Sequence, residues 1–145
     1  MEMITVALRY FDKFAPEGGT VFAHQQMINE DGFVYYGKLG SPLSKKVIAQ
    51  LKENEDKRFL LIHSGGLERY WVHFTDVMRE QPHPNNIPLY YRNRAAEFKT
   101  WFRVIKIEGA PRDIMQHCFV NSSNKILTEA SRHSMSPYFI IRVEE

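Results

Sequence analysis

The chain has 145 residues, of which 43% are hydrophobic and 25% charged, and its formal net charge is +2 at pH 7. This length fits a single domain, 1–145, with its own core, and the composition is typical of a soluble globular protein. The sequence has no apolar run of membrane-spanning length and no signal-peptide pattern, so we expect no membrane partner. The single cysteine, Cys118, excludes an intramolecular disulfide and indicates a reducing compartment, which predicts a cytoplasmic protein.

The first half of the chain predicts strands that alternate with helices. Segments rich in β-branched and aromatic residues predict strands over residues 5–11, 33–36, 58–63 and 70–78. A helix is expected over residues 21–29 with Thr20 as its cap, and the clearest helix covers residues 44–54, which carry one apolar stripe. A Gly-Gly turn separates the last two strands and makes them antiparallel partners.

The second half predicts one long polar loop between strands. In chain order we expect a Pro-rich loop over 81–94, a strand over 98–107, a helical turn over 112–118, an irregular segment over 121–136 and a strand over 138–143. Within the strand 70–78, strict alternation predicts one face with Trp71, His73, Thr75 and Val77. Strands with mostly antiparallel neighbours and a few short helices indicate an α+β fold.

Six large aromatic residues stand out because they lie at strand ends, in strands that flank the polar loop, and in the loop itself. They are Tyr35, Tyr36, Trp71, Tyr90, Tyr91 and Trp101. Aromatic faces that converge on one pocket can sandwich a flat ring such as a nucleobase. The alternative is that the tryptophans belong to the core and the tyrosines cover it.

Basic residues are concentrated beside the Tyr90-Tyr91 loop. From residue 91 to 112 six lysines and arginines, Arg92 and Arg94 among them, face two glutamates, whereas residues 1–86 carry ten basic and eleven acidic residues. Such a strip is typical of a phosphate-binding surface. A solvated strand edge would give the same pattern.

Three segments, taken in order, resemble the YTH and EVE domains. The first is the strand-turn-strand Ile62-His-Ser64-Gly-Gly through Val77, and the second is the strand Phe98-Lys-Thr-Trp101-Phe. The third is Asn121-Ser-Ser-Asn-Lys125-Ile-Leu-Thr followed by Ser-Arg132, where the YTH tail has Pro in place of this Ile and one residue fewer before Ser-Arg. The resemblance covers about residues 20 to 135 and places the chain in the PUA-like superfamily.

The resemblance implies a small curved, mostly antiparallel β-barrel flanked by two or three short helices. In YTH domains an aromatic cage takes up one extruded N6-methyladenine. Tyr35 or Tyr36 corresponds to the first cage tryptophan and Tyr90 or Tyr91 to the second, while Trp71 and Trp101 map to packing positions. Because adjacent strand residues point to opposite faces, we expect one of Tyr35 and Tyr36 to line the cage and the other to pack.

The remaining site residues are predicted from chemistry and position. The asparagine that bonds adenine in YTH domains has no clear counterpart, and Gln25, Gln26 and Asn29 are candidates, of which Gln26 enters the predicted cage together with Ser64. The phosphate contacts are predicted to come from Lys38, Arg92, Arg94, Lys125 and Arg132.

The function that the resemblance implies is a non-catalytic reader, with no cofactor and no metal, of nucleic acid that carries a methylated base. DNA is favoured over RNA, and N6-methyladenine over 5-methylcytosine. Similar domains stand at the N-terminus of McrB-type modification-dependent restriction proteins. The end of the chain in strand residues indicates a fragment that continues into a motor domain, through which the protein would assemble into oligomers.

Three alternatives stay open. The first is a reader of methylated RNA. The second is an ASCH-type amidohydrolase that uses Lys38, Thr75 and Glu80. The third is a two-histidine phosphoesterase, whose His-x-Thr element is matched by His73 and Thr75, although the chain has no second copy with the right spacing. A metal site is not expected, because the six histidines show no ligand spacing.

Overall fold

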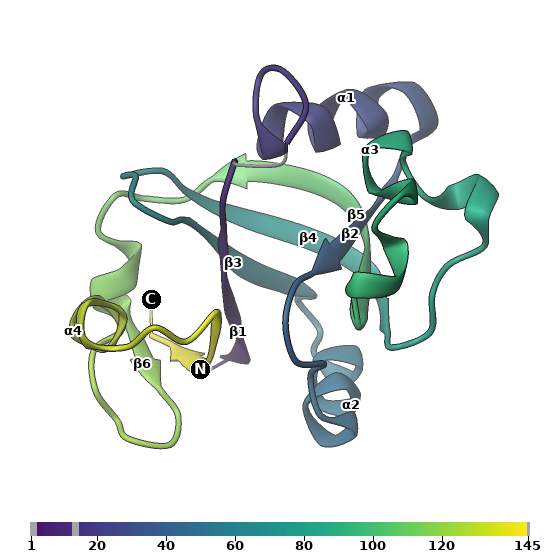
Figure 1. Ribbon diagram of the computed structural model, residues 1–145. Helices are drawn as coiled ribbons and strands as arrows, with labels where there is room; N and C mark the ends of the chain where they lie inside the picture. The colour runs from purple at the N-terminus through teal and green to yellow at the C-terminus, as the bar shows by residue number, and fades with distance from the viewer. Residues whose placement is uncertain (1–2, 13–14, 145) are drawn as a thin grey trace.

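One mixed sheet organises the molecule (Figure 1). The computed structural model describes residues 3–12 and 15–144. Seven strands are hydrogen-bonded in the order β2-β5-β4-β3-β1-β7-β6. Their bounds are β1 Met3–Tyr10, β2 Val34–Lys38, β3 Arg58–His63, β4 Arg69–Met78, β5 Thr100–Gly109, β6 Cys118–Val120 and β7 Tyr138–Val143. The pair β1–β3 is parallel and the other pairs are antiparallel.

Short helices surround this sheet. The α-helices are α1 Thr20–Asp31, α2 Lys45–Glu53, α3 Leu89–Arg92 and α4 Leu127–His133, and short 3-10 helices cover Pro84–Asn86, Ala95–Glu97 and Ile114–His117. In Figure 1, α1 and α3 lie at the end of the molecule opposite α4. None of the helices in the described part of the chain is long and apolar enough to cross a membrane.

The predicted α+β fold with a curved, mostly antiparallel sheet is confirmed. The barrel is open in the described residues, because the edge strands β2 and β6 do not pair with each other.

Helix ends follow local hydrogen bonding. The Ser44 hydroxyl caps α2 by accepting a bond from the amide of Val47 at 3.1 Å, as expected from the sequence. Thr20 is not the cap of α1: its own amide donates to Asp12 Oδ1 at 2.9 Å, so a residue eight positions earlier takes that role. The helix ends at Gly32, whose φ of 84° is in the left-handed region that glycine enters without strain.

A β-bulge in β4 changes which residues share a face from what the sequence predicts. The register with β5 shifts between His73 and Phe74 and again between Phe74 and Asp76. Phe74 and Val77 therefore lie in the same core cluster, while Trp71 lies in another. The prediction that Trp71 and Val77 share a face is wrong, because a bulge inserts a residue and reverses the alternation after it.

Two further expectations are corrected in the second half. The segment predicted as a structureless loop contains Pro84–Asn86 and α3, and the segment predicted as irregular contains α4. α4 forms although its sequence is polar because Leu127 is fully buried in the cluster beneath it. Burial of one apolar residue in the tertiary structure therefore stabilises a helix that intrinsic helix propensity alone does not predict.

We predict that Phe59→Ala destabilises the fold by about 3–5 kcal/mol, since the ring is fully buried and its loss leaves a cavity. Phe59 contacts the rings of Tyr36, Phe74 and Phe102 at centroid distances of 5.7, 6.1 and 4.5 Å. Urea unfolding measures the change, and Phe59→Leu serves as the matched control with a smaller loss. Equal stability of the alanine variant and the wild type would contradict this packing.

Candidate functional site

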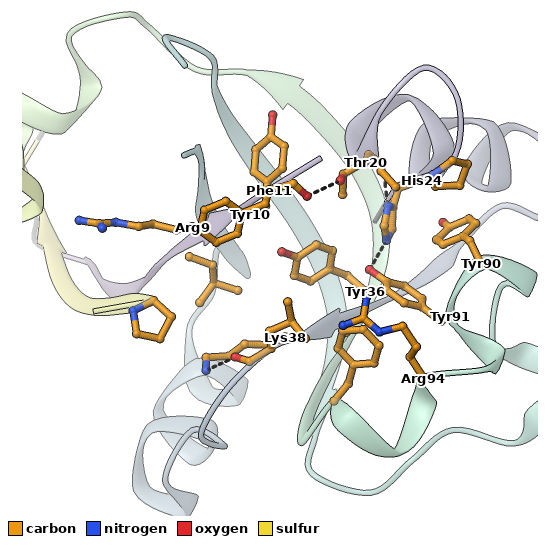
Figure 2. Close-up of a pocket in the computed structure, with 17 residues that line it drawn as sticks. Arg9, Tyr10, Phe11, Thr20, His24, Tyr36, Lys38, Tyr90, Tyr91 and Arg94 are labelled. Carbon is orange, nitrogen blue, oxygen red and sulfur yellow. Dashed lines mark hydrogen bonds between the residues drawn. The ribbon is translucent and has the colours of Figure 1, made fainter. Parts of the chain in front are cut away.

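A cavity of about 360 Å³ opens between β1, β2, α1 and the segment around α3 (Figure 2). Its volume is within the range of small-ligand sites. Much of its wall is aromatic, and the rings that line it belong to Tyr10, Phe11, Tyr36, Tyr90, Tyr91 and Phe98. Segments from residue 8 to residue 137 contribute to it, so the cavity exists only in the folded chain.

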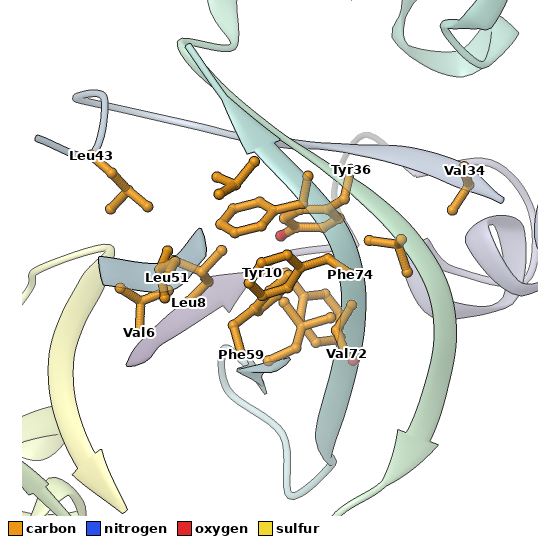
Figure 3. Packing of buried hydrophobic residues seen from close by; sticks show 14 residues of the cluster. Val6, Leu8, Tyr10, Val34, Tyr36, Leu43, Leu51, Phe59, Val72 and Phe74 are labelled. Atoms are coloured by element: carbon orange, nitrogen blue, oxygen red, sulfur yellow. The ribbon is translucent and has the colours of Figure 1, made fainter. Parts of the chain in front are cut away.

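Strand alternation on β2 selects Tyr36 for the pocket. Tyr36 is 7% exposed and lines the cavity, and Figure 3 shows it within the main hydrophobic cluster. Tyr35 is outside the pocket and packs edge-on against Phe33 at 5.9 Å. Gly37 between Tyr36 and Lys38 permits a close approach, because a Cβ there would stand 2.7 Å from Cγ of Phe98.

The short helix α3 brings two neighbouring tyrosines to the same cavity. Tyr90 and Tyr91 both line it, with ring centroids 5.0 Å apart. Tyr91 is buried edge-on against Phe98 and Trp101, at 4.8 and 5.5 Å. Side chains of consecutive helical residues diverge by about 100°, which lets both rings reach one space, whereas a strand would separate them.

A directed hydrogen-bond chain joins α1 to α3. His24 Nδ1 donates to the Thr20 carbonyl at 2.8 Å, because a carbonyl only accepts. Burial lowers the pKa of His24 to about 4, so the ring is neutral at pH 7 and Nε2 is an acceptor. The Tyr91 hydroxyl therefore donates to Nε2, at 2.8 Å.

Three cations, Arg9, Lys38 and Arg94, also line the pocket. Lys38 is 3% exposed and donates to the carbonyls of Leu39 and Ser41 at 3.0 and 2.7 Å. Burial lowers the pKa of Lys38 to about 8, so the ammonium form prevails at pH 7. Arg94 is paired with Glu97, with 2.9 Å between Nε and Oε2.

A family model described as Pua-like matches residues 6–140. The chain belongs to the Pua-like family. Comparisons with curated proteins and with solved structures give no match. Pua-like domains commonly bind nucleic acids, which agrees with an aromatic pocket whose charged lining residues are basic.

The Pua-like domain brings five of the predicted site residues together. These are Tyr36, Lys38, Tyr90, Tyr91 and Arg94. Trp71 and Trp101, at 3% and 0% exposure, are core residues.

Two predicted cage residues, Gln26 and Ser64, lie outside this cavity. Gln26 is on the exposed side of α1, about 200° around the helix from His24. Ser64 lies in the turn after β3, where its amide donates to the Tyr10 carbonyl at 2.9 Å, and it does not line the cavity.

The residues predicted to contact phosphate lie in two places, some in or beside the pocket and others around α4. Arg92 is exposed beside the pocket and donates to the Ile87 carbonyl at 3.2 Å without lining the cavity. Arg132 is an exposed residue of α4, and Lys125 lines a separate cavity with Glu129 of the same helix. Arg9 of the pocket wall donates to the Ser131 carbonyl of α4, so this helix borders the pocket, while neither Lys125 nor Arg132 lines it.

The sequence did not indicate Tyr10 or His24 as pocket residues. Tyr10 lies in a predicted strand, is the last residue of β1, and stacks on His63 at 4.8 Å with 15° between the planes. His24 is an ordinary helix residue in sequence terms. Its only signal is the spacing of four residues to Thr20, which is one helical turn.

The two enzyme arrangements are not assembled. Thr75 is exposed on β4, where it accepts a bond from Arg103 at 3.1 Å, and neither Thr75 nor Glu80 lines the pocket with Lys38. His73 faces the carboxylate of Glu108 at 3.3 Å. Among the residues that the structure describes, no group of histidine, cysteine and acidic side chains is placed to hold a metal ion.

We predict that His24 makes the Pua-like domain less stable as the pH falls from about 6.5 to about 4. In this window the unfolded chain binds a proton at His24 and the folded chain does not, so protons favour unfolding, with a full loss of about 3 kcal/mol below pH 4. Urea unfolding across this range measures the slope. His24→Gln should flatten it, whereas His133→Gln, at an exposed position, should not; parallel slopes for wild type and His24→Gln would refute the assignment.

Proposed function

We propose that this domain is a non-catalytic reader of modified nucleic acid that takes one flipped, methylated base into the pocket. The observation that carries the proposal is the convergence of Tyr36, Tyr90 and Tyr91 on one cavity of about 360 Å³. Three rings held by three different contacts present π faces and edges to a planar ligand without first having to be ordered.

The energetics favour a methylated base over its unmodified form. Stacking on aromatic side chains contributes about 1–3 kcal/mol per base. A methyl group adds apolar surface that an aromatic pocket removes from water, at about 0.8 kcal/mol per carbon. Extrusion from a duplex costs a few kcal/mol, and less where pairing is weakened, so the pocket needs both contributions.

N6-methyladenine in DNA is the favoured ligand in this proposal, with 5-methylcytosine second. The support is the resemblance to YTH and EVE domains together with the Pua-like family match. The proposed setting is a McrB-type restriction system in the cytoplasm. There the domain recruits a motor to methylated DNA, and the motor domain supplies oligomerisation.

A reader role also fits the residues around Lys38. The amidohydrolase alternative needs Thr75 and Glu80 beside this lysine, and both stand outside the pocket. Lys38 instead donates to two backbone carbonyls, which holds it as a fixed positive charge in the wall.

The test compares one oligonucleotide sequence with N6-methyladenine, 5-methylcytosine or no modification, each as DNA and as RNA. Fluorescence anisotropy gives the dissociation constants. We expect the N6-methyladenine DNA to bind about fourfold or more tightly than plain DNA, which corresponds to the burial of one methyl group. Preference for the RNA series would make the domain an RNA reader, and equal binding of all strands would refute the proposal.

We predict that Tyr90→Ala weakens binding of the modified strand by about 1–3 kcal/mol with little change in melting temperature, since this ring is partly exposed in the pocket wall. Tyr90→Phe is the matched control. The Tyr90 hydroxyl is buried and has no hydrogen-bond partner among the described residues, so its removal leaves the stacking face intact and should leave affinity unchanged. A large stability loss with unchanged affinity would assign Tyr90 to the core.

We predict that Arg94→Gln weakens binding of modified and plain strands alike and lowers the slope of log affinity against log salt by about one unit, as the loss of one phosphate contact requires. Lys46→Gln, on the exposed side of α2 and outside the pocket, should leave the slope unchanged. If Arg94→Gln removed discrimination between the strands instead, Arg94 would contact the base.

A further inference from the structure

Arg94 is paired with Glu97, yet the charged side chains that line the pocket are all basic. Its charged lining residues are Arg9, Lys38 and Arg94, and no acidic residue is among the described residues that line it. The carboxylate that begins the neighbouring loop, Asp12, is engaged elsewhere: one oxygen accepts from the Thr20 amide at 2.9 Å and the other lies 3.1 Å from His63 Nε2. A ligand in this cavity therefore meets positive charge without a compensating anion from these residues.

Among the three cations that line the pocket, the lack of a compensating anion matters most for Lys38. It is 3% exposed, and its partners are the uncharged carbonyl oxygens of Leu39 and Ser41. None of the described carboxylates forms an ion pair with it, so two N–H groups are occupied while the charge stays uncompensated. Interactions of a buried charge are screened much less than those at a surface.

Aromatic pockets ordinarily attract cations, but here the protein's own cations occupy neighbouring rings. Lys38 Nζ is 4.4 Å from the ring centre of Tyr138, and the guanidinium of Arg9 is 5.3 Å from that of Phe139. The Arg94 guanidinium is 6.0 Å from the ring centre of Phe98, which itself lines the pocket. Of these three rings only that of Phe98 lines the pocket, so a cationic ligand would meet the Arg94 charge beside a ring that would attract it.

We propose that Lys38 sets a charge filter, by which the pocket accepts methylated bases that are neutral and excludes methylated bases that carry a positive charge. This inference rests on the proposed function and narrows its ligand class. A neutral base also offers ring nitrogens or carbonyl oxygens, which accept a hydrogen bond from the remaining ammonium N–H of Lys38. A cationic base loses that acceptor edge and adds repulsion.

Two isomers of one modified base test the filter. N6-methyladenine is neutral at pH 7, whereas its isomer N1-methyladenine is protonated at this pH and carries a positive charge. Each is placed at the same position of one single-stranded DNA, so that duplex pairing contributes nothing to the difference. Anisotropy titrations at pH 7 should give at least about tenfold tighter binding of the N6-methyl strand by the wild type.

Variants at Lys38 then test whether this residue causes the difference in affinity between the two isomers. Lys38→Met keeps the length and apolar stem of the side chain without its charge, and it should narrow the ratio between the two isomers by about tenfold. Lys38→Arg keeps the charge and should keep most of the ratio. Lys46→Met removes a lysine from the exposed side of α2 and should leave the ratio unchanged. Melting temperatures confirm that each variant is folded.

The outcomes separate this inference from the proposed function. Preference of the wild type for N6-methyladenine over both plain adenine and N1-methyladenine, lost in Lys38→Met, supports both. Tighter binding of N1-methyladenine than of the N6 isomer, or an unchanged ratio in folded Lys38→Met, overturns the filter while the reader function stands. If neither methylated strand binds more tightly than the plain strand, the proposed function fails and the filter fails with it.

Discussion

The hydrogen bond from the Tyr91 hydroxyl to His24 joins two walls of the pocket that are 67 residues apart in the chain. The direction of this hydrogen bond follows from one backbone carbonyl, that of Thr20. Thr20 accepts from Nδ1, which leaves Nε2 as an acceptor, and burial keeps the ring neutral so that this arrangement persists at pH 7. Without this bond the buried Tyr91 hydroxyl and the Nε2 atom of His24 would each lose this partner, while Nδ1 would keep the Thr20 carbonyl.

The walls of the pocket come from two kinds of element, the strands of the sheet and a short helix outside it. β1 and β2 belong to the sheet, and Tyr10 and Tyr36 are packed into its main cluster, so their rings are fixed by the same contacts that stabilise the fold. The α3 segment adds Tyr90 and Tyr91 from outside the sheet. Tyr91 is buried in a cluster with Phe98 and Trp101, whereas Tyr90 is partly exposed, so Tyr90 is the ring of this wall that substitution changes at the lower cost to stability.

Charge and aromaticity act in opposite directions in this pocket. Tyrosine faces attract flat ligands of any charge and favour cations, whereas Arg9, Lys38 and Arg94 repel cations and attract acceptor atoms and phosphates. Planar, neutral and acceptor-rich ligands satisfy both, and nucleobases have all three properties. The Pua-like family, in which nucleic-acid binding is common, is consistent with this combination.

Local composition and periodicity determined six of the strands, all but β6, together with the helix α2 and the α+β class, because these features depend on neighbours within a few residues. The same local rules indicated both tyrosine pairs and the alternation that separates Tyr35 from Tyr36. They failed where distant residues decide: the bulge in β4, the helix α4 over Leu127, and the placement of Gln26, Ser64, Lys125 and Arg132 away from the cavity. Only the tertiary structure shows that Tyr10 and His24 are pocket residues. Pairing of β1 with β3 brings Tyr10 to the pocket, and packing of α1 on β2 and β5 brings His24 there. Such long-range contacts cannot be predicted from a short stretch of sequence.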